Sequence, residues 1–271
     1  MTQSNLLVRP DTANPQGLVH AITPESAGWS YVGFEVHDLR PGATLGRETG
    51  DMEICLVILS GKARIAAGHG AAARDFGVLG ERGSVFEGLP WSVYVPAKSS
   101  YRIVAETACE IAVCASPATG ALPARVIAPA EVGTEVRGKG SNTRHVRNIL
   151  PERAAAESLL VVEVITPGGN WSSYPPHKHD RDALPHESYL EETYYHRLNP
   201  RQGYAVQRVY TDDLSLNETM TVCDRDVVLV PKGYHPVGAA HGYDLYYLNV
   251  MAGPRRTWKF WNDPRHEWQL R

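Results

Sequence analysis

Two histidines separated by a single residue, His177 and His179, form the arrangement in this chain with the clearest capacity for chemistry. In an extended segment side chains alternate between two faces, so both imidazoles would project to the same side. Glu192 follows at the start of a predicted strand, and His235 follows the turn VPKG. Three neutral nitrogens and one carboxylate oxygen can hold a divalent ion while leaving positions open for water or substrate. The spacing therefore predicts one metal centre with these four residues as ligands.

The carboxylate ligand and the metal are less sharply defined than the histidines. Glu191 competes with Glu192, but the Thr-Tyr-Tyr pattern that follows Glu192 is the one expected of a strand that this glutamate opens, and it favours Glu192. Zn, Mn, Fe, Co and Ni all accept such a ligand set. We expect one divalent transition metal and no organic cofactor.

Short apolar segments rich in β-branched and aromatic residues must position these ligands. The 24 glycines and 19 prolines of the 271-residue chain separate such segments along its length. This pattern is typical of an all-β sandwich or barrel. Helices are expected only over residues 151–158 and in the Trp-rich tail after Pro264, and both would be short.

The chain contains an internal repeat. PGATL (41–45), a strand opened by Glu53 and the segment VYVPAKSSY (93–101) recur in the same order as PGGNW (167–171), a strand opened by Glu192 and the segment VLVPKGYH (228–235). Such a repeat predicts two similar halves. We expect an N-terminal half over residues 1–125 and a C-terminal half over residues 126–271.

The two copies differ where the chemistry would lie. Gly42 and Glu53 are 11 positions apart, whereas Gly168 and Glu192 are 24 apart, so the second copy carries about 13 additional residues, among them HKHDRDALPHE. The first copy has Ser100 at the place of His235. The N-terminal half is therefore expected to lack metal ligands, and the C-terminal half to hold the metal.

Composition favours small molecules as partners. The formal charge is −3, from 27 basic and 30 acidic residues without a long basic run, which argues against nucleic acid and anionic membranes as partners. No signal-peptide pattern and no apolar run near the roughly 18 residues of a membrane span is present. Four irregularly spaced cysteines suggest buried thiols. We expect a cytoplasmic protein, either a monomer or a homo-oligomer.

The motifs PPHKHD...LEETYYHRL and DVVLVPKGYHP resemble those of the cupin superfamily, in which an HxH with a following Glu precedes a Pro-containing turn with a His. The stretches WSYVGFEVHDLRPG (29–42), RGKGSNTRHVRNILP (137–151), TPGGNWSSYPPHKHD (166–180) and YHPVGAAHGYDLYYLNVMAGP (234–254) are similar to the 5-deoxy-glucuronate isomerase family of myo-inositol catabolism. The resemblance implies a tandem cupin (bicupin) fold, a divalent metal and an aldose–ketose isomerisation. Its substrate would be the sugar acid 5-deoxy-D-glucuronate, converted through a metal-stabilised enediolate into 2-deoxy-5-keto-D-gluconate.

That isomerisation requires a group that carries a proton between adjacent carbons and a cation for the substrate carboxylate. Candidates for proton transfer are Glu191, His186, His196 and Tyr194; alternation favours Tyr194 and His196, which share a face with Glu192. Candidate cations are Lys178, Arg181, Arg197 and Arg208. Arg144 and Arg147 are expected to be ion-paired strand residues at an interface, with a substrate role as the alternative.

Three other functions remain open at this point. A related 4-deoxy-5-keto-uronate isomerase would use the same fold and metal. A cupin dioxygenase would hold ferrous iron in the same ligand set and consume oxygen. A non-catalytic sugar-binding bicupin would need no open metal position, which argues against it.

Overall fold

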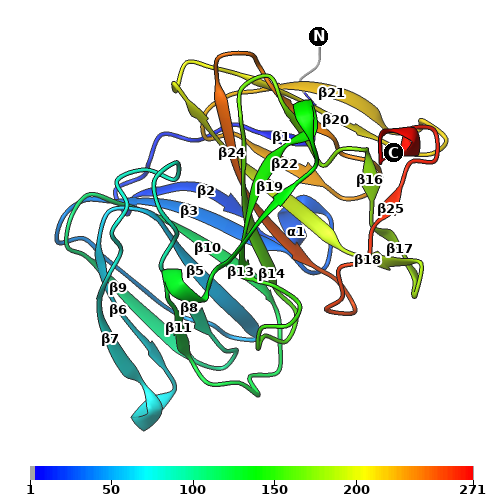
Figure 1. The fold of residues 1–271 in the computed structure, drawn as a ribbon. Helices are drawn as coiled ribbons and strands as arrows, with labels where there is room; N and C mark the ends of the chain where they lie inside the picture. Colours follow the sequence, from blue (N-terminus) through cyan, green and yellow to red (C-terminus); the bar gives the residue numbers. More distant parts are fainter. Residues whose placement is uncertain (1–3, 271) are drawn as a thin grey trace. The chain divides into compact units, whose positions relative to one another are not determined.

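The computed structural model describes residues 4–270, and nearly all of their regular structure is β-strand (Figure 1). The chain divides into two compact units. The N-terminal unit comprises Pro10–Gly133 and Asn148–Val161, and the C-terminal unit comprises Met1–Arg9, Thr134–Arg147 and Val162–Arg271. The only α-helix of residues 4–270 is α1 (Pro24–Ala27), and four 3₁₀ turns accompany it: η1 (Gly70–Ala72), η2 (Pro129–Glu131), η3 (Gly140–Asn142) and η4 (Glu267–Leu270). The all-β expectation is confirmed.

The N-terminal unit is built from two antiparallel sheets. Its six-stranded sheet runs β11 (Arg125–Ile127), β8 (Ser92–Val95), β5 (Met52–Ser60), β10 (Cys109–Pro117), β3 (Gly33–Leu39) and β2 (Leu18–Ile22). Its four-stranded sheet runs β4 (Thr44–Glu48), β9 (Ser100–Ala105), β6 (Ala63–Gly68) and β7 (Arg74–Leu79).

The C-terminal unit has a larger sheet, a smaller sheet and two strand pairs. The larger sheet runs β1 (Leu7–Val8), β22 (Val227–Val230), β19 (Glu191–Asn199), β24 (Asp244–Ala252), β14 (Leu160–Thr166), β13 (Arg144–Leu150) and β12 (Gly133–Arg137). The smaller sheet runs β15 (Trp171–Ser172), β23 (Val237–Ala239), β20 (Ala205–Tyr210) and β21 (Asn217–Val222). The pairs are β16 (His177–Lys178) with β25 (Trp261–Asn262), and β17 (Asp180–Ala183) with β18 (Glu187–Tyr189).

The two units repeat one strand order. The order β8-β5-β10-β3-β2 in the N-terminal unit matches β22-β19-β24-β14-β13 in the C-terminal unit, and β4-β9-β6-β7 matches β15-β23-β20-β21. Strands β16, β17 and β18 lie between β15 and β19 and have no counterpart between β4 and β5, which is where the sequence showed the additional residues. The boundary between residues 125 and 126 stays a prediction, and the units interleave around it: residues before Pro10 belong to the C-terminal unit and Asn148–Val161 to the N-terminal one.

Strand pairing corrects the alignment of the two copies by one residue. Glu192 lies opposite Val230 on β22, and Ile54 lies opposite Val95 on β8. Because Val230 and Val95 each precede the corresponding proline, Ile54 is the counterpart of Glu192. The counterpart of Glu53 is therefore Glu191.

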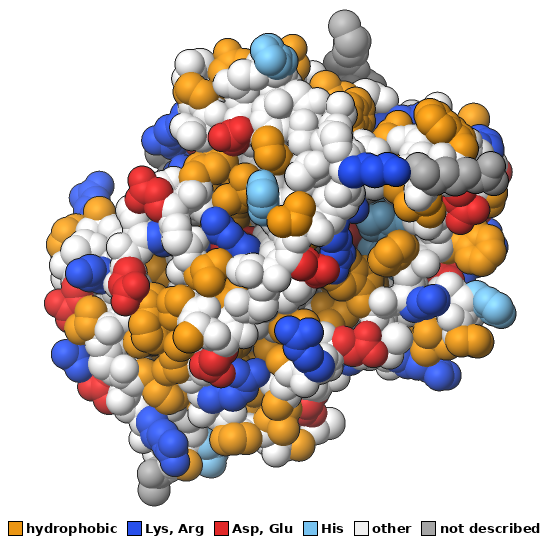
Figure 2. All heavy atoms as spheres, viewed as in Figure 1, with side chains coloured by type: hydrophobic (Ala, Val, Ile, Leu, Met, Phe, Trp, Pro, Cys, Tyr) orange, Lys and Arg blue, Asp and Glu red, His pale blue; other side chains and the backbone are white. Residues whose placement is uncertain are grey.

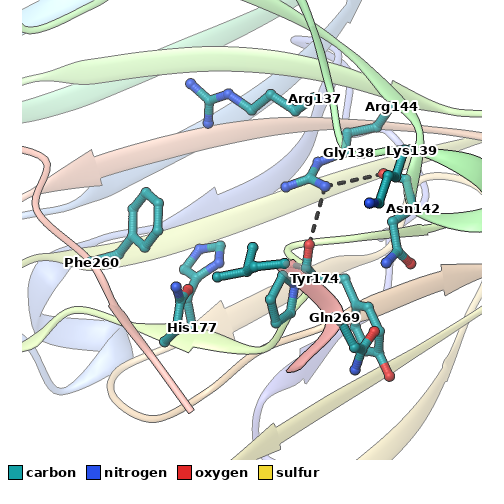
Figure 3. A pocket seen from close by; sticks show the side chains of 12 residues that line it. Arg137, Gly138, Lys139, Asn142, Arg144, Tyr174, His177, Phe260 and Gln269 are labelled. Atoms are coloured by element: carbon teal, nitrogen blue, oxygen red, sulfur yellow. Dashed lines mark hydrogen bonds between the residues drawn. The ribbon is translucent and has the colours of Figure 1, made fainter. Parts of the chain in front are cut away.

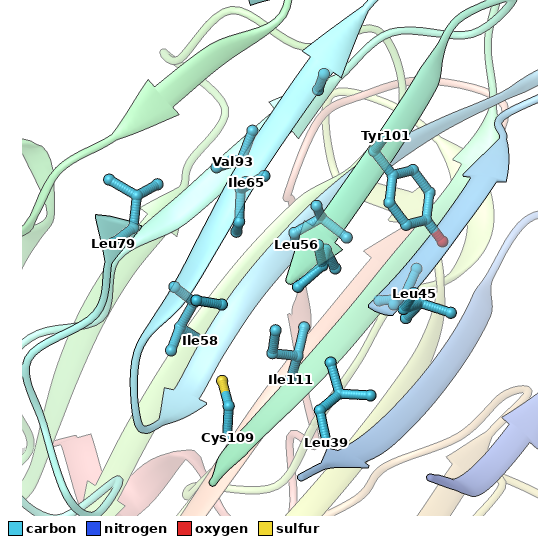
Figure 4. Close-up of a cluster of buried hydrophobic side chains, with 14 of the residues drawn as sticks. Leu39, Leu45, Leu56, Ile58, Ile65, Leu79, Val93, Tyr101, Cys109 and Ile111 are labelled. Carbon is cyan, nitrogen blue, oxygen red and sulfur yellow. The ribbon is translucent and has the colours of Figure 1, made fainter. Parts of the chain in front are cut away.

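In the N-terminal unit, apolar core residues stand at the positions equivalent to those of the predicted metal centre in the C-terminal unit. Alternate side chains of β5, Ile54, Leu56 and Ile58, belong to an apolar cluster between the two sheets of this unit (Figure 4). By the strand pairing, these positions correspond to Glu192, Tyr194 and His196 in the C-terminal unit. The N-terminal unit thus buries hydrocarbon where the C-terminal unit buries polar groups, and this burial stabilises its fold.

The helix expected over residues 151–158 is not formed. This segment makes turns, because its backbone has stronger partners elsewhere in its own unit. The buried carboxylate of Glu53 accepts hydrogen bonds from the backbone N–H groups of Glu157 (2.9 Å), Ser158 (2.6 Å) and Leu159 (2.6 Å). Three donors held by one charged acceptor outweigh the weak propensity of an eight-residue helix.

Surface properties agree with the composition. On the face shown in Figure 2, basic and acidic side chains are interspersed. Within residues 4–270, none of the helices has the length and apolar character needed to span a bilayer. Cys55, Cys109 and Cys114 are buried thiols as expected, whereas Cys223 is exposed.

Candidate metal centre

The short strand β16 positions the histidine pair. His177 lies opposite Asn262 and Lys178 opposite Trp261 on β25, so the segment is extended through both residues (Figure 1). The rings of His177 and His179 are 6.3 Å apart, measured between centroids. As the alternation rule predicts, the two imidazoles lie on one side of the segment, and Lys178 lies on the other.

His235 reaches the same place from a tight turn after β22. Gly233 has a φ of +90°, and a Cβ there would lie 2.5 Å from the carbonyl oxygen of Tyr210, so this position requires glycine. The Nδ1–H of His235 donates to the carbonyl oxygen of Gly233 at 2.8 Å, which fixes the ring. Its centroid is 4.9 Å from that of His177 and 5.0 Å from that of His179.

Glu192, the second residue of strand β19, completes the cluster. One of its oxygens, Oε2, lies 3.1 Å from Nε2 of His179 and 3.2 Å from Nε2 of His235. One ring nitrogen from each of the three histidines lies within 4.8 Å of the others. Glu191, the neighbouring residue, projects to the opposite face of β19 by alternation.

The hydrogen bonds of the imidazoles make this cluster suited to a cation. A carbonyl oxygen can only accept, so the bonds from Nδ1 of His179 to Leu190 (2.9 Å) and from Nδ1 of His235 to Gly233 put the hydrogen on Nδ1 of each ring. In the neutral form of each ring, Nε2 then carries a lone pair on the side of the buried carboxylate of Glu192, which lies 3.1 Å from Nε2 of His179 and 3.2 Å from Nε2 of His235. Lone pairs and a carboxylate that face one another are stabilised by a positive charge between them. A proton on His179, whose pKa Glu192 raises against the opposing effect of burial, supplies one, and a divalent ion would supply a larger one.

The pKa values of Glu192 and His177 favour the charged carboxylate and the neutral imidazole, which are the forms that bind a cation. Burial raises the pKa of Glu192, but the hydrogen bonds and charges of His179 and His235 outweigh burial and leave the pKa below its ordinary value. Burial, together with the two neighbouring histidines, holds the pKa of His177 well below its ordinary value. His177 is therefore neutral, which is the form that binds metal.

Lys178 is buried among carboxylates rather than beside the histidines. Its Nζ lies 2.6 Å from Asp180, 3.4 Å from Glu187 and 3.6 Å from Asp212, and the side chain is 2% exposed. These acids compensate its charge. The lysine thus ties the additional hairpin β17–β18 to the segment that carries His177 and His179.

The other sequence-predicted cations also have partners away from the histidines. Arg181 is exposed and pairs with Asp212 at 2.9 Å. Arg208 donates to Asn217 and lies over the ring of Tyr210, and Arg197 pairs with Asp224. None of the three arginines lines the pocket that opens beside His177.

The candidates for proton transfer differ in position. Tyr194 is buried with its ring 5.8 Å from that of His235, and its hydroxyl is hydrogen-bonded to Ser173 at 2.9 Å. His196 stacks behind Tyr194 at 5.9 Å and bonds to Gln207, and burial lowers its pKa to about 3. His186 lies exposed in the β17–β18 turn. Tyr194 is thus the candidate closest to the cluster.

A pocket of about 580 Å³ opens beside His177 (Figure 3). Its lining residues are Arg137, Gly138, Lys139, Asn142, Arg144, Tyr174, Pro175, His177, Phe260, Asn262, Gln269 and Leu270. Three of them are cations and none is acidic. Sequence reasoning did not single out Arg137 and Lys139, although both lie in the stretch RGKGSNTRH (137–145) that carried part of the family resemblance.

The two strand arginines of that region have different environments. Arg147 pairs with the buried Glu163 at 2.9 Å, which is the ion-paired strand position expected of it. Arg144 lines the pocket instead. Within residues 4–270 its hydrogen bonds are to the backbone carbonyls of Asn142 and Tyr174, both at 3.1 Å, and an ion pair of Arg144 at an interface stays a prediction.

Comparison with known proteins finds relatives along almost the whole chain. Residues 6–269 match the model of the KduI/IolB family. Proteins named 5-deoxy-glucuronate isomerase are 60% identical in Geobacillus kaustophilus and 50% identical in Bacillus subtilis, with 98% of this chain covered in both and 96% and 99% of the relatives.

Solved structures agree. An IolB-like protein from Salmonella typhimurium LT2 superposes with a TM-score of 0.95 at 50% identity, covering 99% of this chain and all of the other. The oxalate decarboxylase of Lactobacillus farciminis superposes with a TM-score of 0.68 at 14% identity, over 97% of this chain and 89% of its own. The latter likeness concerns the fold alone, and the tandem cupin fold expected from the sequence is confirmed.

Proposed function

This chain belongs to the KduI/IolB family, and on that premise we propose that it is a 5-deoxy-glucuronate isomerase. The reaction converts the aldehyde sugar acid 5-deoxy-D-glucuronate into its 2-keto isomer, 2-deoxy-5-keto-D-gluconate, in myo-inositol catabolism. No redox partner is consumed, because the hydrogen lost at one carbon is gained at its neighbour. The observation that carries the proposal is the cluster of His177, His179, His235 and Glu192, of which His177 lines a sugar-sized pocket.

We propose His177, His179, Glu192 and His235 as the ligands of one divalent transition metal. Support comes from the convergent Nε2 atoms of His179 and His235 and from the backbone carbonyls that hold their Nδ1–H groups. A metal ion bound there supplies Lewis-acid polarisation of the substrate carbonyl and stabilises the negative charge of an enediolate. Zn, Mn, Fe, Co and Ni all suit this ligand set.

Tyr194 is our proposed donor to the reacting oxygen of the substrate. Burial, reinforced by the charge of Glu192, raises its pKa well above the ordinary value, so its hydroxyl keeps its proton and can donate a hydrogen bond to a developing oxyanion. A hydroxyl in this state is a donor and not the base that takes the proton from C2. Its bond to Ser173 fixes the direction of that hydroxyl. His196 has too low a pKa to serve as an effective base at neutral pH, and Glu191 projects to the other face of β19.

An assay with the purified, metal-loaded protein tests the function. Loss of the aldehyde of 5-deoxy-D-glucuronate should be observed, and it should vanish in the double variant His177→Ala/His179→Ala. A folded, metal-loaded protein without turnover would overturn the assignment. Turnover of 4-deoxy-5-keto-uronate in its place would identify the related isomerase, and oxygen consumption would identify a dioxygenase. The cytoplasmic location remains a prediction.

A further inference from the structure

Arg144 differs from Arg137, which lines the same pocket, in having no acidic partner within residues 4–270. Arg137 pairs with Glu135 at 2.7 Å and stacks on the ring of Trp258 at 5.1 Å. For Arg144, in contrast, no carboxylate of residues 4–270 lies within ion-pair distance. The side chain of Arg144 is half-buried, and holding a guanidinium there without a counter-charge is costly, so an anion bound beside it would be stabilised.

The hydrogen bonds of Arg144 leave one edge of the guanidinium available. Both of its bonds, to the carbonyls of Asn142 and Tyr174, use Nη1. The pair Nε and Nη2 has no partner in the described part of the chain, and this pair is the edge that binds a carboxylate through two parallel hydrogen bonds. The arginine is therefore held in place with one bidentate donor edge unused.

The loop before β13 is shaped to hold this side chain. Gly138 has a φ of +76°, and a Cβ there would lie 2.1 Å from the carbonyl oxygen of Asn142 and 2.8 Å from Nη1 of Arg144. A side chain at position 138 would displace the guanidinium, so the glycine permits its placement. Figure 3 shows Arg144 bonded to this loop and to Tyr174, on the same hollow as the ring of His177.

The charge of Arg144 also acts on the histidine cluster. Its positive charge is among the influences that lower the pKa of His177, after burial and the two other histidines. Burial is the main cause that lowers the pKa of Arg144 itself. An anion bound at Arg144 would relieve both effects, because it would offset the unpaired charge in the pocket.

From this geometry we infer that Arg144 binds the carboxylate of the substrate, so that a sugar acid spans the pocket from the histidine cluster to Nε and Nη2 of Arg144. This inference rests on the proposed function and adds to it the reason for acid specificity. The substrate is an open-chain sugar with an aldehyde at C1 and a carboxylate at C6. A site with one cation at each end selects both the acid and the direction in which it lies.

Substrate comparison tests the inference. The variant Arg144→Gln should lower kcat/KM for 5-deoxy-D-glucuronate by about 10- to 150-fold, the equivalent of a lost charged hydrogen bond. It should barely change kcat/KM for the neutral analogue 5-deoxy-D-glucose, in which a hydroxymethyl group replaces the carboxylate. Arg144→Lys should restore part of the preference, because charge returns without the bidentate edge. The matched control is Arg201→Gln, an exposed arginine paired with Asp224.

A binding measurement separates this role from a structural one. The substrate reduced at C1 to the alcohol cannot isomerise, and calorimetric titration should show its affinity falling by a similar factor in Arg144→Gln while metal content is unchanged. Equal losses for the acid and the neutral sugar, or unchanged affinity for the reduced acid, would overturn the inference and leave the proposed function intact. Absence of turnover by the unaltered protein would overturn the proposed function, and the inference with it.

Discussion

Asp180 accepts a hydrogen bond from the backbone N–H of Gly233 at 2.9 Å, and this bond joins two of the segments that carry the clustered histidines. Asp180 directly follows His179, and the carbonyl of Gly233 holds the ring of His235. The other oxygen of Asp180 binds Lys178 at 2.6 Å. The positions of the histidines therefore depend on a buried ion pair that touches none of their Nε2 atoms.

The first prediction concerns this link. Asp180→Asn weakens the pair with Lys178 and the bond to Gly233, so the affinity for Zn²⁺ should fall by about 10- to 100-fold, the usual effect of losing a group that orients metal ligands. Competition with a chromogenic chelator measures it. Asp213→Asn, at an exposed aspartate in a turn, is the matched control. Unaltered affinity in Asp180→Asn would show that the link does not position the site.

The second prediction separates the two adjacent glutamates. Glu192→Gln removes the carboxylate that faces His179 and His235, so metal content per folded protein should fall sharply. Glu191→Gln alters a residue on the opposite face of the same strand and should retain its metal. Elemental analysis of dialysed protein reads out both variants, and the reverse result would exchange their roles.

A third prediction concerns the stability of the N-terminal unit. Glu53→Ala would leave three backbone N–H groups, of which that of Leu159 is buried, and the hydroxyl of Tyr94 without their acceptor. The free energy of unfolding should drop by about 3–5 kcal/mol, as when one partner of a buried charged network is removed. Glu53→Gln keeps one acceptor oxygen and should cost less. Urea denaturation measures both, and a loss below about 1 kcal/mol for the alanine variant would contradict the prediction.

The fourth prediction is a pH dependence. Burial lowers the pKa of His196 to about 3 from an ordinary value of 6.5, against the opposing effect of its bond to Gln207. The unfolded chain therefore binds a proton first as pH falls, so stability is fully present above about pH 6.5 and declines toward pH 3. Between pH 6.5 and 5, this residue should account for up to about 2 kcal/mol of lost stability.

Denaturation of metal-free protein at these two pH values tests this. His196→Gln cannot titrate and keeps a nitrogen donor for Gln207, so its stability should fall less steeply toward acid than that of the unaltered protein. Parallel pH profiles for the two proteins would show that His196 does not bind the proton.

Much of the C-terminal site was predictable because its spacing is local. Alternation along an extended strand was enough to place His177 and His179 together, and the Pro-containing turn indicated His235. The preference for Glu192 over Glu191 used the same rule, and the structure brings Glu192 to the histidines. The repeat predicted two similar halves, and the two units share one strand order.

What could not be predicted depends on contacts between residues distant in sequence. Nothing local distinguishes Lys178, which is buried among acids, from a lysine that binds substrate, and Arg144 acquires its position from Tyr174, thirty residues away. The segment 151–158 has a helical pattern, but the carboxylate of Glu53 binds its backbone more than a hundred positions away. Such competition is decided by tertiary partners and not by propensity.

The interleaving of the two units has a consequence for how the gene could be divided. Strand β1 pairs with β22 in the C-terminal unit, and residues 148–161 belong to the N-terminal unit. A cut near the midpoint of the sequence would separate β22 from its neighbour β1, and Glu53 from the three backbone N–H groups that donate to it. Each fragment would present open hydrogen-bonding edges, which favour association with other chains. The two units are thus expected to fold only as parts of one chain.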